Sequence, residues 1–457
     1  MKIRSPRASL LFSRPGAAPT QPRRVCLECL SANRAQLSPS NSRSFHLSGR
    51  QHAASWAQAA KLAANVISNA TSQQGRVDRQ ISIDPLRIVA KEMKFLSGNI
   101  RQLLGSGHPS LDKVAKYYTQ AEGKHFRPLL VLLMSRATAM TPKCSTYDPS
   151  KPSANINSGL SRPDILLDHN PTSPGTNPLT DPAYAYSPTD SDILPSQRRL
   201  AEITELIHTA SLLHDDVIDH SDSRRGSPSA NLEFGNKMAV LAGDFLLGRA
   251  SIALARLRDA EVVELLATVI ANLVEGEFMQ LKNTSRDEKN PQWTEEALTY
   301  YLQKTYLKTA SLISKSCRAA AILGGSDNVT VEAAYSYGKN LGLAFQLVDD
   351  MLDYTITEKE LGKPAGADLE LGLATAPLLF AWKNNPELGA LVGRKFAEEG
   401  DVSRARYIVS QSEGIEQTRA LARDYADQAL AAIEPFPESE AKDGLREMVA
   451  KTINRRK

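Results

Sequence analysis

Apolar residues recur every three or four positions along most of the chain after residue 83, and this spacing predicts amphipathic helices. The stretch Leu200–Leu213 shows the pattern clearly, because an apolar side chain returns to the same face at each turn. Few stretches alternate apolar and polar residues as half-buried strands do. We therefore predict an all-α fold, a single large helical bundle. Its helices are expected at residues 85–96, 111–118, 128–138, 200–219, 237–258, 262–281, 294–323, 331–354, 374–383, 388–399 and 415–433.

Three of these helices have recognisable ends. Asp84 can cap a helix whose first position is Pro85, because a proline has no N–H to leave unpaired there. Pro128 suits the first position of a later helix for the same reason. Gly324 and Gly325 follow residues 294–323 and are suited to end that helix. The ordered domain is expected to span residues 83–457.

The first 52 residues differ in composition from the rest of the 457-residue chain. They carry nine Lys or Arg residues against Glu28 alone, a formal charge of +8, and because the whole chain carries +4, the remainder carries −4. A basic, serine-rich and acid-poor start without a continuous apolar run is typical of a mitochondrial transit peptide. We interpret 1–52 as such a peptide, with the mature start near Ala53, and 53–82 as a linker; a disordered basic tail is the alternative.

Other compositional features exclude several classes of protein. A slightly acidic body argues against a nucleic-acid surface. Four cysteines are too few and too scattered for a disulfide framework, and the pair Cys26 and Cys29 has metal-like spacing but no second pair to complete a site. No apolar run reaches about 18 residues, so no transmembrane helix is predicted.

Residues 141–196 interrupt the helical pattern. They are rich in Pro, Ser, Thr, Asn and Asp, which is typical of a disordered segment. We interpret them as a disordered insertion on the surface that joins two helices of the domain. A loop that binds a partner or regulates the protein remains the alternative.

Two clusters of aspartate lie inside apolar helices. Asp215 and Asp219 are four residues apart and project from one side of a predicted helix, and Asp349 and Asp353 repeat this arrangement. One such cluster alone would be a helix cap or a solvated face. Two clusters within apolar runs would leave carboxylates buried at a high cost unless cations compensate them. Because Mg²⁺ takes one or two carboxylates and completes its shell with water and phosphate, the pattern indicates a diphosphate ligand.

The two motifs resemble the paired DDxxD motifs of the trans-isoprenyl diphosphate synthases. The resemblance extends from about Asp84 to the C-terminus apart from the insertion, and its motifs occur in the family's order. It implies an isoprenoid-synthase bundle of helices around a central cavity. The matching segments are Gly123–Pro128, Asp215–Asp219, Arg224–Gly226, Gly243–Asp244, Lys308–Thr309, Asp349–Asp353 and Gly362–Asp368.

The resemblance also implies the role of individual residues in binding an allylic diphosphate and several Mg²⁺ ions. We expect Asp215, Asp219 and Asp349 to be metal ligands and, with Lys308, to carry the chemistry. The further metal-site residues are Asp216, Asp350 and Asp353, and the allylic diphosphate site consists of Arg224, Lys308, Thr309, Gln346 and Lys363.

The second substrate, isopentenyl diphosphate, needs only to be held, because its diphosphate does not leave. Arginine and lysine side chains suffice for this. By resemblance the site consists of Lys124, Arg127, His208 and Arg225, although an isolated histidine on an apolar helix is commonly a core residue. The implied reaction is ionisation, attack by the isopentenyl double bond and proton loss, in repeated 1'-4 condensations. No protein base is evident in the sequence.

Product length is expected to depend on Ala210 and Ser211, five and four residues before Asp215. The family places a bulky residue at the fifth position in many enzymes with short products. The small Ala210 and the leader therefore favour a long-chain enzyme that makes the ubiquinone tail over a short-chain, geranylgeranyl-type synthase. A terpene cyclase is disfavoured by the second motif, and a non-catalytic subunit by two intact motifs. We expect a homodimer, with a heteromer and contact with the inner mitochondrial membrane left open.

Overall fold

The computed structural model describes residues 84–106, 108–120, 125–145, 156, 159–161, 192–283, 291–355 and 366–455. The predicted leader and linker lie outside these residues, as do most of the insertion and two expected site residues, Lys124 and Lys363. The described part consists almost entirely of helices, which confirms the all-α prediction.

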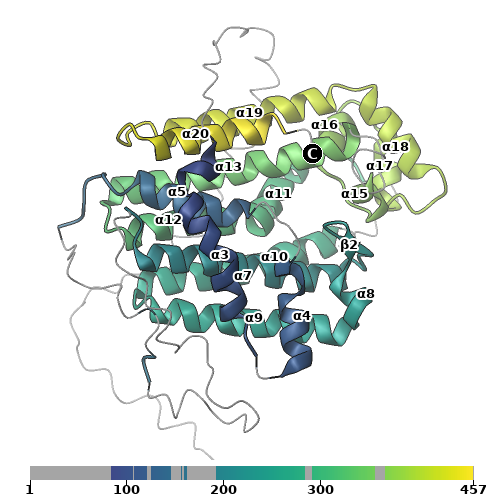
Figure 1. Ribbon diagram of the computed structural model, residues 1–457. Coiled ribbons are helices and arrows are strands. Elements are labelled where there is room, and N and C mark those ends of the chain that lie inside the picture. Colours follow the sequence, from purple (N-terminus) through teal and green to yellow (C-terminus); the bar gives the residue numbers. More distant parts are fainter. Residues whose placement is uncertain are drawn as a thin grey trace, which may run out of the picture. The chain divides into compact units, whose positions relative to one another are not determined.

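Helices α7 and α13 are the long central elements of the bundle (Figure 1). Helix α7 lies against α5, α9 and α12, and α13 lies against α12, α19 and the π-helical turn η4. The bounds are α2 Pro85–Ile88, α3 Ala90–Leu103, α4 Pro109–Gln120, α5 Phe126–Ala137, α7 Pro195–Ile218, β1 Ser223–Arg224, β2 Ser227–Pro228, α8 Ala230–Phe234, α9 Asn236–Arg256, α10 Ala260–Asn283, α11 Glu295–Thr305, η4 Tyr306–Ala310, α12 Ser311–Leu323, α13 Asn328–Thr355, α15 Ala367–Glu370, α16 Ala376–Trp382, α17 Glu387–Gly393, α18 Asp401–Ser410, α19 Gly414–Ala432 and α20 Glu440–Ile453.

The apolar stripe of α7 is fully buried, as its periodicity predicted. Leu200, Ile203, Leu206, Ala210 and Leu213 have no exposed surface and belong to one core shared with α5, α9, α12 and α13. The aspartates at the end of α7 are therefore attached to a helix that is largely buried in the core.

The first predicted helix, at 85–96, is in fact two helices. Asp84 caps α2 as expected, since its carboxylate accepts a hydrogen bond from the Leu86 N–H at 3.3 Å. The helix then stops at Ile88, whose carbonyl accepts a hydrogen bond from Arg136 of α5 at 2.6 Å. A tertiary contact thus stabilises the chain direction at the break between α2 and α3, which local sequence does not show.

Pro128 is the third residue of α5 and not the first, so that prediction was wrong. Helix α5 begins at Phe126, after His125 in a left-handed conformation with φ of +39°. The helix tolerates a proline here because the first four N–H groups of a helix have no intrahelical partner. The earlier start brings Arg127 onto the first turn of α5.

The predicted helix 294–323 contains a π-helical turn, η4, that interrupts it at Tyr306–Ala310. Two glycines flank this turn. A Cβ at Gly342 of α13 would lie 2.7 Å from the Cα of Ala310. A Cβ at Gly276 of α10 would lie 3.0 Å from the backbone nitrogen of Lys308. Such turns are common at functional sites. Here close packing of the glycine backbones keeps Lys308 and Thr309 between α10 and α13.

A short hairpin follows the first aspartate helix. Strands β1 and β2 are antiparallel, and Arg224 pairs with Ser227. The two residues between them, Arg225 and Gly226, both have positive φ, as a two-residue hairpin turn with matched twist requires. The hairpin returns Arg224 towards the aspartates of α7.

The insertion is narrower than the predicted range of 141–196. At its start, the Cys144 N–H donates to the Gly325 carbonyl and the Asp327 N–H to the Pro142 carbonyl, both at 2.9 Å. At its end, α7 already begins at Pro195. Residues 141–145 are therefore anchored on the loop between α12 and α13, and the remaining insertion lies largely outside the described residues.

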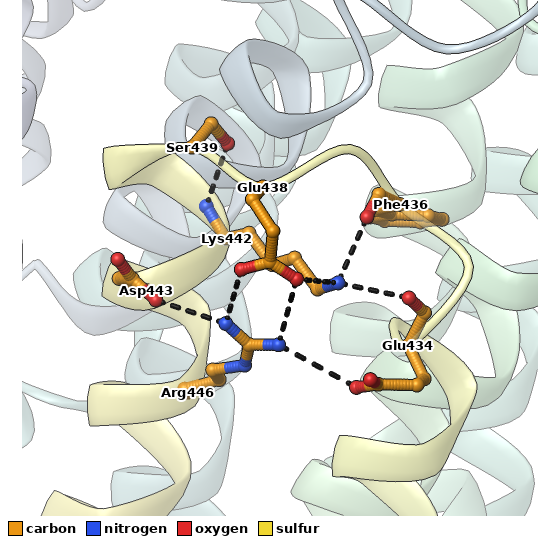
Figure 2. A network of polar contacts seen from close by, with 7 residues as sticks. All are labelled: Glu434, Phe436, Glu438, Ser439, Lys442, Asp443 and Arg446. Atoms are coloured by element: carbon orange, nitrogen blue, oxygen red, sulfur yellow. Dashed lines mark hydrogen bonds and ion pairs between the residues drawn. The ribbon is translucent and has the colours of Figure 1, made fainter.

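The C-terminal part contains two helices, α18 and α20, that were not predicted from the sequence. A polar network connects α19 to α20 (Figure 2). The Lys442 ammonium group, almost fully buried, donates to the carbonyls of Glu434 and Phe436 at 2.8 Å each and to the Glu438 carboxylate at 2.6 Å. Bonds from Arg446 and Lys442 lower the pKa of Glu438 to about 2. This network orients α20 along the bundle.

One described helix, α9, is long and apolar enough to cross a membrane by length and composition. Core helices can have the same length and composition, so the absence of a transmembrane helix stays a prediction. Helix α9 lies against α7, α4 and α8. Of its most apolar 18-residue stretch, 39% is buried inside the protein. Packing within the bundle therefore accounts for part of its apolar composition.

Candidate active site

The six aspartates of the two motifs differ in what they contact. Asp216 is completely buried and accepts hydrogen bonds from the Tyr118 hydroxyl and from Arg224, whose Nε lies 2.9 Å away. The same Tyr118 hydroxyl accepts the Ala230 N–H at 2.7 Å. Asp216 thus joins α7 to α4 and to the hairpin. Its contacts indicate that it stabilises the surroundings of the site and does not bind a metal ion directly.

Asp350 has the corresponding position in the second motif. Its carboxylate accepts the Tyr301 hydroxyl at 2.5 Å and the Gln346 amide at 2.8 Å. The Thr309 hydroxyl donates to the Gln346 carbonyl oxygen at 2.9 Å. Two residues expected at the allylic diphosphate, Thr309 and Gln346, are therefore brought together and coupled to Asp350. This chain of bonds extends from the π-helical turn to α13.

Asp215 and Asp219 have no such support. Within the described residues neither side chain accepts a hydrogen bond, and burial raises the pKa of both, that of Asp215 to about 6. In the second motif, Asp349 accepts a hydrogen bond from Arg455, and burial raises its pKa to about 6 as well. Asp353 accepts the Asp368 N–H at 3.4 Å. Asp215, Asp219 and Asp349 are thus the carboxylates for which an added cation would remove an electrostatic cost.

These donors fit magnesium. Carboxylate oxygens are hard ligands, and Mg²⁺ commonly takes one or two of them with water and phosphate in the other positions. In the part of the chain that the structure describes, no group of three His, Cys, Asp or Glu side chains converges closely enough to hold a metal alone. A site completed by a diphosphate is consistent with that arrangement.

The raised pKa values predict how the metal-free protein responds to pH. A carboxyl group whose pKa is higher in the folded state than its ordinary value of 3.8 stabilises the fold below about pH 4, and this contribution is lost as pH rises through about 6. We expect the Tm of the metal-free protein to fall by about 3 °C over this window because of Asp215 and Asp349, and Mg²⁺ to restore it at pH 7.5.

Thermal melts in EDTA from about pH 4 to pH 7.5 test this expectation. The matched protein is the double variant Asp215→Asn/Asp349→Asn, which should show a smaller fall because it lacks both ionisable groups. Identical slopes for the two proteins would contradict the assignment of the pH effect to these aspartates.

Lys308 lies on the π-helical turn and faces α10. Its ammonium group is 2.6 Å from the Glu277 carboxylate and donates to the Gln280 side-chain oxygen at 3.0 Å. Burial acts to lower the pKa of Lys308, but the carboxylates of Asp215 and Glu277 outweigh it and the pKa is raised. Sequence reasoning found Lys308 and missed Glu277 and Gln280. The available signal was two polar residues three apart on the apolar helix α10.

A second group of cations lies where α5 meets α7. Arg127 Nη1 is 2.9 Å from His208 Nε2, and Arg225 Nη1 donates to the Tyr118 carbonyl at 3.4 Å. Burial and then the charge of Arg127 hold the pKa of His208 well below its ordinary value, so the imidazole is neutral and accepts from Arg127. Asp349 acts electrostatically on Arg127 from α13. The structure thus brings Arg127, His208 and Arg225 to one region, whereas Lys124 lies outside the described residues.

Arg455, near the C-terminus, is a further residue that sequence reasoning did not place in the site. It forms an ion pair with Asp349, and its guanidinium group lies 4.8 Å from the centre of the Phe345 ring. The contact exists because α20 runs back along α13, which no local pattern predicts.

The residues expected to control product length are on the same helix as the first motif. Ala210 is fully buried, and Ser211 is partly buried with its hydroxyl donating to the His208 carbonyl at 2.9 Å. The role of both in product length stays a prediction.

Comparisons with known proteins agree with this geometry. The family model of the polyprenyl synthetases matches residues 179–409. The chain is 67% identical over its full length to the whole of a probable mitochondrial hexaprenyl pyrophosphate synthase of Neurospora crassa. It is 48% identical to decaprenyl-diphosphate synthase subunit 1 of Schizosaccharomyces pombe over 81% of this chain and 91% of that one. A polyprenyl synthase of Caulobacter crescentus, solved with calcium and isoprenyl diphosphate, has a TM-score of 0.64 at 31% identity and covers 84% of this chain and 100% of that chain.

These likenesses decide between the alternatives left by the sequence. The relatives are named as hexaprenyl and decaprenyl synthases, which favours a long-chain enzyme over a short-chain one. The Neurospora crassa relative is named as mitochondrial. The full match includes both aspartate motifs, so a terpene cyclase is no longer a competing interpretation. The chain therefore belongs to the polyprenyl synthetase family, as a mitochondrial long-chain polyprenyl diphosphate synthase.

Proposed function

We propose that this enzyme condenses isopentenyl diphosphate with an allylic diphosphate in repeated 1'-4 steps, with several Mg²⁺ ions in each active site, and that its product becomes the tail of ubiquinone. The observation that carries the proposal is the difference between two neighbouring charge environments. The first contains Lys308 and carboxylates that accept no hydrogen bond from the protein. The second contains Arg127 and a neutral His208. One substrate would then bind with metal and the other with cations of the protein alone.

The allylic substrate is assigned to the aspartates of α7 and α13. Bound Mg²⁺ would neutralise charge that develops on the departing diphosphate. Lys308 would hold the same group as a cation, and Lys363 and Arg224 complete the proposed set. Thr309 and Gln346, already bonded to each other, would orient it.

The isopentenyl substrate is assigned to Arg127, Arg225, Lys124 and His208. A neutral His208 accepts a hydrogen bond from Arg127 and so fixes the guanidinium group without competing for an anion. No carboxylate or imidazole is assigned as the base, and the released diphosphate is proposed to take the proton. The protein then supplies positioning, charge and exclusion of water.

Product analysis tests the proposal. Purified enzyme with farnesyl diphosphate, isopentenyl diphosphate and Mg²⁺ should make a hexaprenyl or longer diphosphate, detected by mass spectrometry. The number of isoprene units should equal that in the side chain of ubiquinone extracted from the same organism. Products of a different length from that side chain would contradict the ubiquinone assignment.

The two proposed substrate sites should separate kinetically. We expect Arg127→Ala and Lys124→Ala to raise KM for isopentenyl diphosphate about 100-fold, because each removes a charged hydrogen bond to the held diphosphate. KM for the allylic substrate should change less than about threefold. Steady-state kinetics with each substrate varied in turn measures both values, and equal increases would contradict the division into two sites.

We also propose that a second copy of this chain covers the outer face of α9 and α10. These helices are neighbours, and their exposed side chains include Leu241 of α9 at 57% and Phe278 of α10 at 69% exposure. An apolar face of this kind is typical of an interface. Light scattering of the purified protein distinguishes a homodimer from a monomer that needs a different subunit.

A further inference from the structure

Glu277 of α10 is a buried carboxylate beside the proposed allylic diphosphate site. It is 7% exposed, and its Oε2 lies 2.6 Å from the Lys308 ammonium group. Lys308 also acts on it as a hydrogen-bond donor, and within the described residues no other partner is found for either carboxylate oxygen. Buried carboxylates usually have several hydrogen-bond partners, and one that depends on a single lysine needs an explanation. A diphosphate that bound Lys308 more strongly would take this partner away from Glu277.

The close packing of α10 on the π-helical turn makes this contact. Gly276 brings the α10 backbone against Lys308, so the adjacent Glu277 faces the lysine. Gln280, one turn further along α10, supplies a neutral oxygen to the same ammonium group at 3.0 Å. Lys308 is therefore held by one charged and one uncharged acceptor from a single helix.

The charges around Lys308 do not balance without metal. Asp215, Asp219 and Glu277 are three carboxylates near this ammonium group, and the charges of Asp215 and Glu277 act on it most strongly. Lys304 is a second ammonium group nearby, but the carboxylates of Asp350 and Asp368 act on it more strongly than Glu277 does. Arg224 is already paired with Asp216. An incoming diphosphate would meet a net negative charge and would have to compete with Glu277 for Lys308. Bound divalent cations would reverse that charge.

We propose that Glu277 is a positioning residue that retains Lys308 until metal ions have bound, so that the enzyme takes up metal before the allylic diphosphate. This inference rests on the proposed role of Lys308. Glu277 supports metal binding by adding negative charge, and it opposes diphosphate binding in the absence of metal by occupying Lys308. The charge of Glu277 therefore has opposite effects on the two ligands.

The test uses isothermal titration calorimetry on the full-length protein, with inorganic pyrophosphate in EDTA and with Mg²⁺ alone. We expect Glu277→Gln to tighten metal-free pyrophosphate binding at least tenfold and to weaken Mg²⁺ binding about tenfold, because one nearby charge is removed while the side-chain shape is kept. Weaker binding of both ligands with a lower Tm would overturn the proposal, because that is the result of a structural role. Unchanged affinities would overturn it as well.

Three matched variants separate the causes. Gln280→Leu removes a hydrogen bond to Lys308 without changing the charge, so metal-free pyrophosphate should not bind more tightly. Glu275→Gln removes an exposed charge from the same helix and should change neither affinity. The double variant Glu277→Gln/Lys308→Ala should lose the tightening, and tightening that persists there would show that Glu277 does not act through Lys308.

The single variant Lys308→Ala distinguishes failure of this inference from failure of the proposed site. If Lys308 binds the diphosphate, Lys308→Ala weakens pyrophosphate binding in the presence of Mg²⁺ by at least tenfold. If that variant has wild-type affinity, the assignment of Lys308 to the diphosphate is wrong. If it loses affinity while Glu277→Gln behaves as wild type, the site stands and the role of Glu277 is wrong.

Discussion

Asp215→Ala and Asp349→Ala are each expected to lower kcat at least 1,000-fold, a change of about 4 kcal/mol in the barrier. Both carboxylates are unsupported or only partly supported by protein groups, and burial raises their pKa to about 6. Removal of either should disrupt the neutralisation of the departing diphosphate. Neither should destabilise the protein, because loss of a crowded buried carboxylate relieves an unfavourable charge.

Turnover and Tm must be measured on the same preparations. Asp427→Ala, an exposed aspartate on α19, is the matched control and should keep wild-type turnover. Asp216→Ala provides a contrast, because it breaks the buried contacts with Tyr118 and Arg224 and should lower Tm by several degrees. Near wild-type turnover in Asp215→Ala or Asp349→Ala would remove that residue from the metal site.

Ala210→Phe is expected to shorten the product to about four isoprene units. Ala210 is five residues before Asp215 on α7, and one helical turn advances about 5.4 Å, close to the reach of one isoprene unit. A benzyl group at this position would stop a tail that descends along α7 towards Leu206. The first condensations should keep their rates, because the aspartates and Lys308 are unchanged.

Chain-length distributions from chromatography measure the effect. Ala210 is fully buried, so a phenylalanine could cost stability through overpacking. Ser211→Phe, at a partly buried neighbour, provides a second probe that needs less space in the core. An unchanged distribution in folded and active forms of both variants would show that product length is set elsewhere.

Some features of this protein follow from sequence because they depend on local periodicity. The positions of α7, α9, α10, α13 and α19 were predicted to within about five residues from apolar spacing and end signals. The stretch that forms α11, η4 and α12 was predicted as one helix. The two aspartate clusters were likewise evident, since a spacing of four places carboxylates on one helix face. Helices α18 and α20 were not predicted, because they are more polar on average than α7 or α9 although their apolar residues recur with helical spacing.

Other features were decided only by the tertiary structure. The π-helical turn at Lys308 depends on glycines of α10 and α13, which are distant in sequence. In the sequence, Asp216 and Asp350 look equivalent to the other aspartates of the motifs. In the structure, their carboxylates accept hydrogen bonds from buried tyrosine hydroxyls. Pairs such as Glu277 with Lys308 and Asp349 with Arg455 join separate helices. Periodicity defines which face of a helix is apolar, whereas packing between helices determines which polar groups meet.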